Sequence, residues 1–330
     1  MARAYNSFAQ LQNGVYRFIA GGKRVNDAAD AGARHVTIVG GVHGNERIGV
    51  AVLDALRLAL LHVSPLRTSG GATVFPTLTP QSSVTLVYGN PAAIRVGKRG
   101  STPHADLNRC FSADMLSPSS PPTSYEQRRA QELAPIFAAS DVMLDLHSTN
   151  KPSEPFVRIA GNRVIPSHIA HMVAKLPCDI VLHDPNYLLA DGTVALTDEY
   201  VGAQGGVGIC YESGLASDLS EAKINSIIGG ILQILEDDTK SIEPLATTAN
   251  NSKNETRAAT AMTKYEITQV FKLTENGFRW ADGVGDTNFQ RIPVHQPIGF
   301  IGRGRDETPF TVDYDAHIVF PKIASLWKLG

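Results

Sequence analysis

The sequence predicts an α/β fold in which helices flank a mixed, largely parallel sheet, followed by a small β domain at the C-terminal end. Strand-like and helix-like segments alternate through the first two-thirds of the 330 residues. Residues 247–260 then form a polar stretch without apolar periodicity, as is typical of a linker. Beyond it, Gly and Pro separate segments that alternate like strands. We therefore expect an α/β domain over residues 1–243, with a linker and a small β domain over residues 244–330.

The elements of the α/β domain follow from the spacing of its apolar residues. Short apolar runs between turn-forming residues predict buried strands, and apolar residues three or four positions apart, such as Ile48, Val52 and Leu56, predict helices. The predicted strands are 36–39, 84–88, 142–146, 156–159, 179–182 and 207–211, and the predicted helices are 47–62, 124–139 and about 219–235. In the C-terminal part, residues 265–273 alternate like a strand and residues 317–320 close the series.

Charge and cysteine content narrow the class of protein. The chain has 30 Lys and Arg against 32 Asp and Glu without a long run of either sign, which argues against a nucleic-acid or membrane-surface partner. We expect a small-molecule partner instead. Cys110, Cys178 and Cys210 have unrelated spacings that give neither a disulfide framework nor a cysteine metal cage. They favour a reducing compartment.

The N-terminal residues are not followed by the apolar segment of a signal peptide, and no apolar stretch reaches membrane-spanning length. We therefore expect a cytoplasmic protein without membrane attachment. The sequence leaves the oligomeric state open, and a homo-oligomer is compatible with it.

His43 and Glu46 lie directly after the predicted strand 36–39, in the segment Gly41-Val42-His43-Gly44-Asn45-Glu46. Side chains at the carboxyl ends of buried strands face a crevice, where open α/β sheets bind ligands. Alone the pair is a weak signal, because a surface His beside a Glu at a helix start is common. His147, after another apolar run, supplies a third ligand. Two His and one Glu suit zinc and leave its fourth position for water or substrate.

The segment Asp106-Leu107-Asn108-Arg109 is a second polar group. Adjacent Asn and Arg side chains can bind a carboxylate, since the guanidinium group matches its geometry and stays charged. A salt bridge between Asp106 and Arg109 within the loop is the simpler alternative. Arg99, beside Lys98, is a candidate for a second cationic contact.

Glu212 is an acidic residue at the end of the predicted strand 207–211. A buried carboxylate at this position is costly unless it is paired or functional. Close to a zinc-bound water, it would be placed to act as a general base. A capping or salt-bridged glutamate explains the residue equally well.

Together these segments resemble the succinylglutamate desuccinylase/aspartoacylase family, a relative of the zinc carboxypeptidases. The resemblance runs from about residue 36 to residue 320 and rests on ordered motifs. The motifs are residues 41–46, 89–91, 97–99, 106–111, 125–130, 145–147, 212–214, 313–315 and 319–321. It implies a zinc carboxypeptidase-like fold, with a catalytic α/β domain and a C-terminal domain that contributes to the active-site wall.

The resemblance also implies the metal site and the chemistry. One Zn²⁺ per chain would be bound by His43, Glu46 and His147. Glu212 would be the general base and acid, and Arg99 would polarise the scissile carbonyl. The implied activity is hydrolysis of the amide bond of a small N-acetyl- or N-succinyl-amino acid by Glu-assisted attack of zinc-bound water.

Three further residues are implied to contact the substrate. Asn108 and Arg109 would bind its α-carboxylate, and Tyr314 would reach it from the C-terminal domain. The acyl group and the amino acid are not specified by these residues.

The chain departs from the aspartoacylases before Glu212. Aspartoacylases have an Arg about ten residues upstream that binds the side-chain carboxylate of aspartate, whereas residues 197–204 contain no Arg. This puts N-acetylaspartate in doubt as the substrate. Asp198 and Glu199 could face a cationic or neutral side chain, although a solvated helix face is the commoner explanation. Other contacts to an anionic substrate could come from three cationic residues: Lys98, Lys151 and Arg158.

Two alternatives to the amidohydrolase are open. A zinc carboxypeptidase acting on small peptides would need an open cleft, which a C-terminal domain contributing Tyr314 should narrow. A non-catalytic small-molecule-binding relative is disfavoured, because the three ligands and Glu212 occur together.

Overall fold

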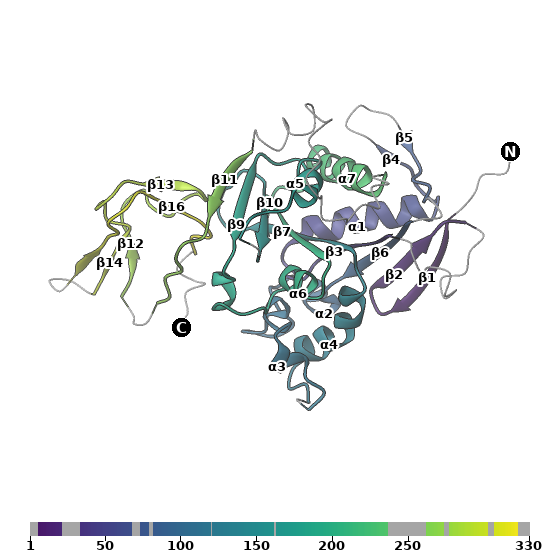
Figure 1. Ribbon diagram of the computed structural model, residues 1–330, viewed down its shortest axis with the longest axis horizontal. Coiled ribbons are helices and arrows are strands. Elements are labelled where there is room, and N and C mark those ends of the chain that lie inside the picture. Colours follow the sequence, from purple (N-terminus) through teal and green to yellow (C-terminus); the bar gives the residue numbers. More distant parts are fainter. Residues whose placement is uncertain are drawn as a thin grey trace.

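The computed structural model describes residues 6–21, 34–67, 73–78, 82–119, 121–161, 163–236, 262–273, 277–302 and 307–322. A nine-stranded sheet spans most of this part, in the order β1-β2-β6-β3-β7-β10-β8-β9-β11 (Figure 1). Its strands are β1 (Ser7–Gln12), β2 (Val15–Ile19), β3 (Arg34–Gly40), β6 (Ser82–Tyr88), β7 (Val142–Thr149), β8 (Phe156–Ala160), β9 (Ile180–Asp184), β10 (Val207–Leu215) and β11 (Thr263–Glu266).

The centre of the sheet is parallel and its flanks are mixed. Strands β6, β3, β7 and β10 run in one direction. The β1–β2 hairpin lies antiparallel on one side, and β8 pairs antiparallel with β10 on the other, followed by β9 and β11. The predicted mixed, largely parallel sheet is confirmed. The carboxyl ends of β3, β7 and β10 therefore meet at one edge.

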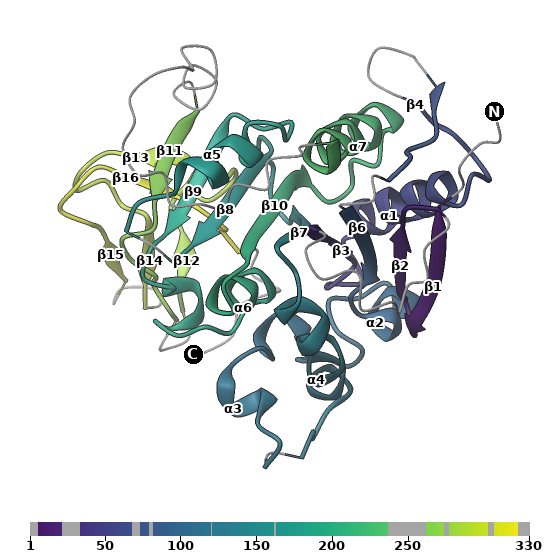
Figure 2. The same ribbon diagram turned by 45° about the vertical axis from the view of Figure 1, so that its right-hand side comes forward.

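Helices cover both faces of the sheet. Figures 1 and 2 show α1 (Arg47–Leu60), α5 (Ser167–Val173) and α7 (Glu221–Glu236) on one face. The other face carries α2 (Pro91–Val96), α3 (Ala113–Leu116), α4 (Tyr125–Ala138) and α6 (Thr197–Ala203). Strand β3 shows why both layers form, since Ile38 packs in the α1 core and Val39 in the α4 core.

Strand β10 lies between β7 and β8, although it follows both in the chain. Residues 150–155 connect β7 to β8 and so pass over the carboxyl end of β10. The passage is close, because a Cβ added at Gly214 would lie 2.6 Å from the Ser153 carbonyl oxygen. Gly214 also has a φ of +87°, a conformation that glycine adopts without strain.

The C-terminal part forms two small sheets. Strands β12 (Arg279–Trp280), β14 (Gly299–Ile301) and β15 (Thr308–Phe310) form one, and β13 (Gln290–Ile292) pairs with β16 (Ala316–Ile318) in the other. The rings of Phe289 and Phe320 pack against Phe156 of β8. The C-terminal segment thus docks beside the main sheet. A further short ladder joins β4 (Leu66–Arg67) to β5 (Thr73–Val74).

Several element boundaries differ from the prediction. The β1–β2 hairpin was not predicted, and the predicted strand 265–273 ends at Glu266 as β11, which joins the main sheet. Strands β7 and β10 continue past their apolar runs, so His147 and Glu212 lie within them. The predicted linker 247–260 lies outside the described residues.

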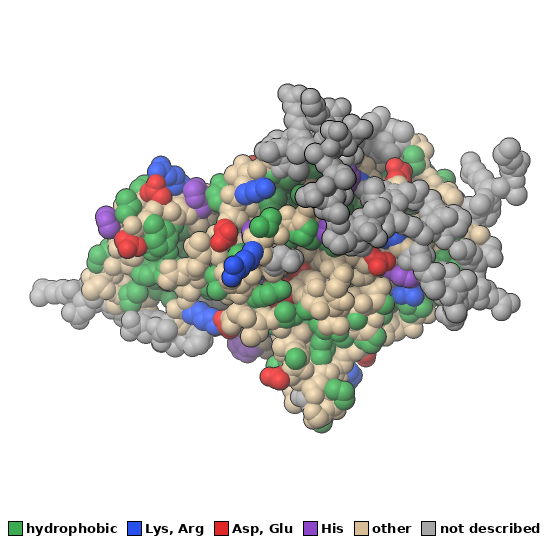
Figure 3. Space-filling view, in the orientation of Figure 1, with side chains coloured by type: hydrophobic (Ala, Val, Ile, Leu, Met, Phe, Trp, Pro, Cys, Tyr) green, Lys and Arg blue, Asp and Glu red, His purple; other side chains and the backbone are tan. Residues whose placement is uncertain are grey.

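The surface carries both signs of charge. In Figure 3 the coloured acidic and basic side chains are scattered over the visible face and do not form one large patch. Among the described residues, none of the helices combines the length and apolar character needed to cross a membrane.

Candidate active site

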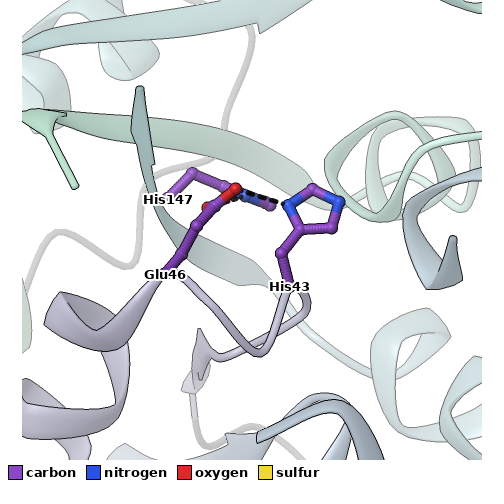
Figure 4. Close-up of side chains that lie close together, drawn as sticks. All are labelled: His43, Glu46 and His147. Atoms are coloured by element: carbon purple, nitrogen blue, oxygen red, sulfur yellow. Dashed lines mark hydrogen bonds and ion pairs between the residues drawn. The ribbon is translucent and has the colours of Figure 1, made fainter. Parts of the chain in front are cut away.

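Three buried side chains converge at the carboxyl edge of the sheet. His43 comes from the loop after β3, Glu46 from the residue before α1, and His147 from β7 (Figure 4). His43 Nδ1 lies 2.8 Å from Glu46 Oε1, and His147 Nδ1 lies 2.9 Å from Glu46 Oε2. The three donor atoms lie within 4.8 Å of one another. The structure thus brings together the three predicted metal ligands.

The loop that carries His43 and Glu46 fits tightly against α2. A Cβ added at Gly44 would lie 2.0 Å from the carbonyl group of Ala93, so a larger residue would push the loop away. Glu46 is fixed further by the backbone N–H of Ser148, which donates to Oε2 over 3.1 Å. This tight packing explains why the two ligands sit in a short Gly-containing turn.

A carboxylate lies behind each histidine ring. His43 Nε2 lies 3.1 Å from Asp106 Oδ1, and His147 Nε2 lies 3.0 Å from Asp145 Oδ2. Metal-ligating histidines usually present their second ring nitrogen to such a carboxylate, which fixes the tautomer and makes the ligand nitrogen more basic. Both ligand nitrogens are therefore held toward Glu46.

The electrostatics favour an ionised Glu46. Burial alone would raise its pKa, but the His43 and His147 rings that face it hold the pKa below its ordinary value. For His147, burial opposes the charged ring, whereas Asp145 and Glu46 raise its pKa.

The donor set fits zinc. Two imidazole nitrogens and a carboxylate oxygen are ligands that zinc accepts, and all three residues are at most 4% exposed. One oxygen of Glu212, Oε2, is buried at this edge without a hydrogen-bond partner. Such an atom is expected where a further ligand or water completes the site.

Glu212 lies beside the metal ligands. Its Cα pairs with that of His147 on β7 and with that of Phe156 on β8. The residue is 7% exposed, and burial raises its pKa to about 7. The sheet therefore places a carboxylate that takes up and releases a proton near neutral pH next to His147.

Arg99 and Asp106 form an ion pair at one side of the site. Arg99 Nη2 lies 2.9 Å from Asp106 Oδ2, and its Nη1 lies 3.9 Å from Glu46 Oε1. The Arg99 side chain is 39% exposed, so part of it faces solvent. Burial would raise the pKa of Asp106, but His43 and Arg99 hold it far below its ordinary value. The structure thus pairs Asp106 with Arg99 and not with Arg109.

Asn108 and Arg109 occupy the 3₁₀ turn η2 (Leu107–Arg109) directly after Asp106. Asn108 is buried, and its side-chain oxygen accepts a hydrogen bond from the backbone N–H of Thr197 and lies 3.1 Å from the Thr197 hydroxyl oxygen. Arg109 Nη1 donates to the Asn108 carbonyl oxygen over 2.6 Å, and the residue as a whole is exposed.

Asp198 and Glu199 do not lie on a solvated helix face, so that expectation is wrong. Both residues of α6 are at most 3% exposed, and Arg158 of β8 pairs with them at 2.7 Å and 2.9 Å. Arg158 is itself 1% exposed and is enclosed by these acids. Asp184 is a third acidic neighbour, 3.5 Å from Arg158. The charges of this buried cluster therefore compensate one another inside the protein.

The remaining predicted residues are Tyr314, Lys151 and Lys98. Tyr314 donates its hydroxyl hydrogen to Gln269 over 2.8 Å within the C-terminal segment. Lys151 lies 3.6 Å from Asp286, and Lys98 is exposed. The recorded contacts of Tyr314 do not include the histidine ligands, so its role in binding the substrate stays a prediction.

Four residues to which the sequence analysis gave no role of their own hold the site or the segments around it. Asp145 supports His147, and Thr197 contacts both Asp145 and Asn108. Glu126 of α4 accepts hydrogen bonds from Asn90 and Ser101, and Arg129 donates to the carbonyl oxygen of Gly89. Asp145 could have been found, because it is two residues before His147 and faces the same side of β7.

The sequence matches a known catalytic domain. Residues 32–237 match the model of the succinylglutamate desuccinylase/aspartoacylase catalytic domain. The chain is 36% identical over 121 residues to N-acyl-aromatic-L-amino acid amidohydrolase (carboxylate-forming) B of Danio rerio, covering 34% of each protein. It is 34% identical over 121 residues to a probable aspartoacylase of a Nostoc species, covering 34% of this chain and 35% of that protein. The chain thus matches about a third of the length of these relatives.

Solved structures share the fold. Succinylglutamate desuccinylase from Chromobacterium violaceum aligns with a TM-score of 0.61 at 18% identity, covering 89% of this chain and 85% of the other. Murine aminoacylase 3 aligns with a TM-score of 0.59 at 20% identity, covering 89% and 91%. The domain match covers more than half of the sequence and contains all three converging ligands. The chain therefore belongs to the succinylglutamate desuccinylase/aspartoacylase family.

Proposed function

We propose that this chain is a zinc-dependent amidohydrolase that cleaves the amide bond of small N-acyl amino acids. The observation that carries the proposal is the convergence of His43, Glu46 and His147, with Glu212 beside them on the next strand. His43, Glu46 and His147 would hold the zinc. Zinc in a site of this kind supplies Lewis acidity and lowers the pKa of water towards neutrality. The names of the relatives support the same reaction class.

Glu212 moves the proton in the proposed reaction. Its carboxylate takes a proton from the attacking water, and the water oxygen forms the new bond to the acyl carbon. The C–N bond of the amide then breaks, and Glu212 gives the proton to the departing amine nitrogen. The products are a free carboxylate and a free amino acid. Arg99, whose Nη1 lies 3.9 Å from Glu46 Oε1, would stabilise the negative charge on the carbonyl oxygen.

Asn108 and Arg109 would bind the α-carboxylate of the substrate. Asn108 uses its side-chain oxygen for Thr197, so its amide nitrogen is the atom that would donate to the carboxylate. Arg109 is exposed and adds a cationic donor beside it. Tyr314 would approach from the C-terminal segment.

We further propose that the preferred amino-acid side chain is uncharged. A substrate with a side-chain carboxylate needs a second cation in the pocket. Arg158 is already paired with Asp198 and Glu199, and α6 contains no Arg. Among the described residues, this region therefore offsets little of the free energy that a second carboxylate loses when it leaves water.

Metal content and amine release together test the proposal. The purified protein would be analysed for zinc and assayed with N-acetyl- and N-succinyl-amino acids that carry acidic, aliphatic or aromatic side chains. We expect one zinc per chain and fastest amine release from a substrate with an uncharged side chain. Glu212→Gln should keep the zinc and lose hydrolysis, because a carboxamide cannot accept the proton.

Three outcomes would contradict the proposal. Faster cleavage of short peptides than of N-acyl amino acids would indicate a carboxypeptidase. Binding of N-acyl amino acids without any turnover would indicate a non-catalytic relative. A zinc-loaded Glu212→Gln variant as active as the wild type would exclude the role of Glu212. N-acetylaspartate as the best substrate would contradict only the proposed side-chain preference.

A further inference from the structure

Thr197 stands between the metal site and the substrate carboxylate site. It is the first residue of α6 and is fully buried. Its hydroxyl oxygen contacts Asp145 Oδ2 through a short hydrogen bond and lies 3.1 Å from Asn108 Oδ1. Its backbone N–H lies 3.0 Å from the same Asn108 oxygen. One residue thus touches the carboxylate behind His147 and the amide of Asn108.

The number of hydrogens on the hydroxyl group determines which of these hydrogen bonds it donates. The hydroxyl group of Thr197 has one hydrogen, and both of its neighbours are acceptor oxygens. Asp145 is the charged and closer acceptor, so the hydroxyl group donates to it. The backbone N–H then satisfies Asn108, which leaves the Asn108 amide nitrogen turned away from Thr197.

Helix α6 is held firmly in the position that Thr197 needs. Asp198 and Glu199, the next two residues, pair with the buried Arg158. On β10, a Cβ added at Gly208 would lie 1.9 Å from the Asp198 carbonyl oxygen, so the helix rests directly on the strand. The side chain of Thr197 therefore has little freedom to move away from Asp145.

We infer that Thr197 is a positioning residue that couples the carboxylate clamp at Asn108 to the metal ligand His147 through Asp145. The inference rests on the proposed function, in which these groups bind substrate and zinc. Asp145 is fully buried, and its other oxygen, Oδ1, has no hydrogen-bond partner. Without the Thr197 hydroxyl group, the carboxylate would lose the donor that fixes its orientation toward His147.

Zinc affinity of the full chain, measured by competition with a chelating dye, tests the inference. Thr197→Val keeps the branched shape and the backbone N–H but removes the hydroxyl group. We expect zinc to bind about tenfold more weakly. This is at the lower end of the losses of metal affinity known for mutation of residues that support metal ligands. Thr197→Ser should restore affinity to within about twofold of the wild type, because serine keeps the donor.

A matched control removes an equivalent group elsewhere. Thr37 of β3 is also buried, and its hydroxyl group lies 2.6 Å from that of Ser140, outside the metal-site contacts. Thr37→Val should leave zinc affinity unchanged. Unchanged zinc affinity in Thr197→Val, or an equal loss in Thr37→Val, would overturn the inference. If Thr197→Val does not fold, Thr197→Ala compared with Thr197→Ser gives the same decision.

A double-mutant cycle tests the coupling itself. The side chain of Asn108 hydrogen-bonds to Thr197 and to neither His147 nor Asp145, and the backbone N–H that it donates to Asp106 Oδ1 is kept in Asn108→Ala, so the loss of the side chain should act on zinc affinity through Thr197. We expect about a threefold weakening in the wild-type background and none in the Thr197→Val background. Equal effects in both backgrounds would overturn the coupling. Zinc titration needs no substrate, so a failure of the proposed amide hydrolysis would be recognised separately.

Discussion

At the scale of single residues, burial gives Glu212 its chemical character. It lies next to His147 with one carboxylate oxygen unpartnered, and burial raises its pKa to about 7. A carboxyl group with an ordinary pKa would be a much weaker base at neutral pH. In the proposed reaction, the same shift would allow it to return the proton to an amine leaving group.

The pH dependence of kcat/KM should therefore follow Glu212. Below its pKa the carboxyl group is protonated and cannot accept a proton, so kcat/KM should fall as the pH drops below about 7. The charge of a bound zinc ion would move this midpoint lower. Rates measured from pH 5 to pH 9, with zinc content checked at each pH, test the prediction. In Glu212→Gln the activity should fall about 10²- to 10⁴-fold, and the decrease of kcat/KM at low pH should disappear. If the decrease persists, another group causes it.

Arg109→Ala should weaken binding of the substrate carboxylate. A charge-assisted hydrogen bond would be lost, so KM should rise about 10- to 100-fold for substrates with a free α-carboxylate. The matching α-amide substrates lack the negative charge and should show little change in KM. Steady-state kinetics on both series make this comparison, and an equal rise for both would argue against the clamp.

The sequence predicts the residues that do chemistry better than those that orient them. The ligands His43, Glu46 and His147 follow from strand ends and residue type, and the structure brings them together. Thr197 could not be found in this way, because its contacts to Asn108 and Asp145 join segments far apart in the chain.

At the scale of secondary structure elements, α6 depends on one arginine. Arg158 of β8 is the cation that compensates Asp198 and Glu199 inside the protein. Burial and Glu199 raise the pKa of Asp198 to about 6, although Arg158 opposes this shift. The cluster therefore joins α6 to the neighbouring strand.

Arg158→Met should destabilise the protein strongly. It leaves three buried acids, Asp184, Asp198 and Glu199, without their cation, which costs about 3–5 kcal/mol of the free energy of unfolding. Urea unfolding of the variant would measure this loss. Arg279→Met is the control, since Arg279 pairs with Glu307 on the exposed surface and its loss should matter little. Similar midpoints for Arg158→Met and the wild type would show that the cluster does not hold α6.

Elements with clear periodicity were predicted, and elements fixed by tertiary contacts were not. Helix α1 and the central strands follow from apolar spacing, although β7 and β10 extend into polar residues that mask the pattern. The β1–β2 hairpin was missed, but Asn13-Gly14 between its strands is a recognised turn signal. The burial of Asp198 and Glu199 depends on Arg158, which lies on another strand.

At the scale of the whole molecule, Asn288 ties the C-terminal segment to the catalytic domain. Its backbone N–H donates to Pro152 over 2.9 Å, and its side-chain oxygen accepts from the N–H of Phe320 over 2.7 Å. Pro152 belongs to the connection 150–155 that passes over β10. The C-terminal segment is therefore fastened close to Glu212.

Asn288→Ala should loosen this attachment. The variant loses the hydrogen bonds of Nδ2 to the Lys151 and Pro152 carbonyl oxygens, both 3.4 Å, and the bond from Phe320, so the C-terminal segment should become more sensitive to limited proteolysis and KM should rise several-fold, with zinc affinity unchanged. Gln290→Ala is the control, because among the described residues its side chain bonds to Gly283 and Gly285 of the same segment. A proteolysis rate for Asn288→Ala no faster than that of the control would contradict the prediction.

The position of β10 between β7 and β8 makes completion of the site depend on contacts of long sequence separation. Both neighbours precede β10 in the chain. In the native sheet they do not pair with each other, because β10 lies between them. In the native sheet residues 207–215 pair with both of these strands, and the connection 150–155 passes over their carboxyl end. Contacts of such long sequence separation form slowly. The three predicted metal ligands precede β10 in the chain, so Glu212 joins them only when this central strand has paired across a long sequence separation.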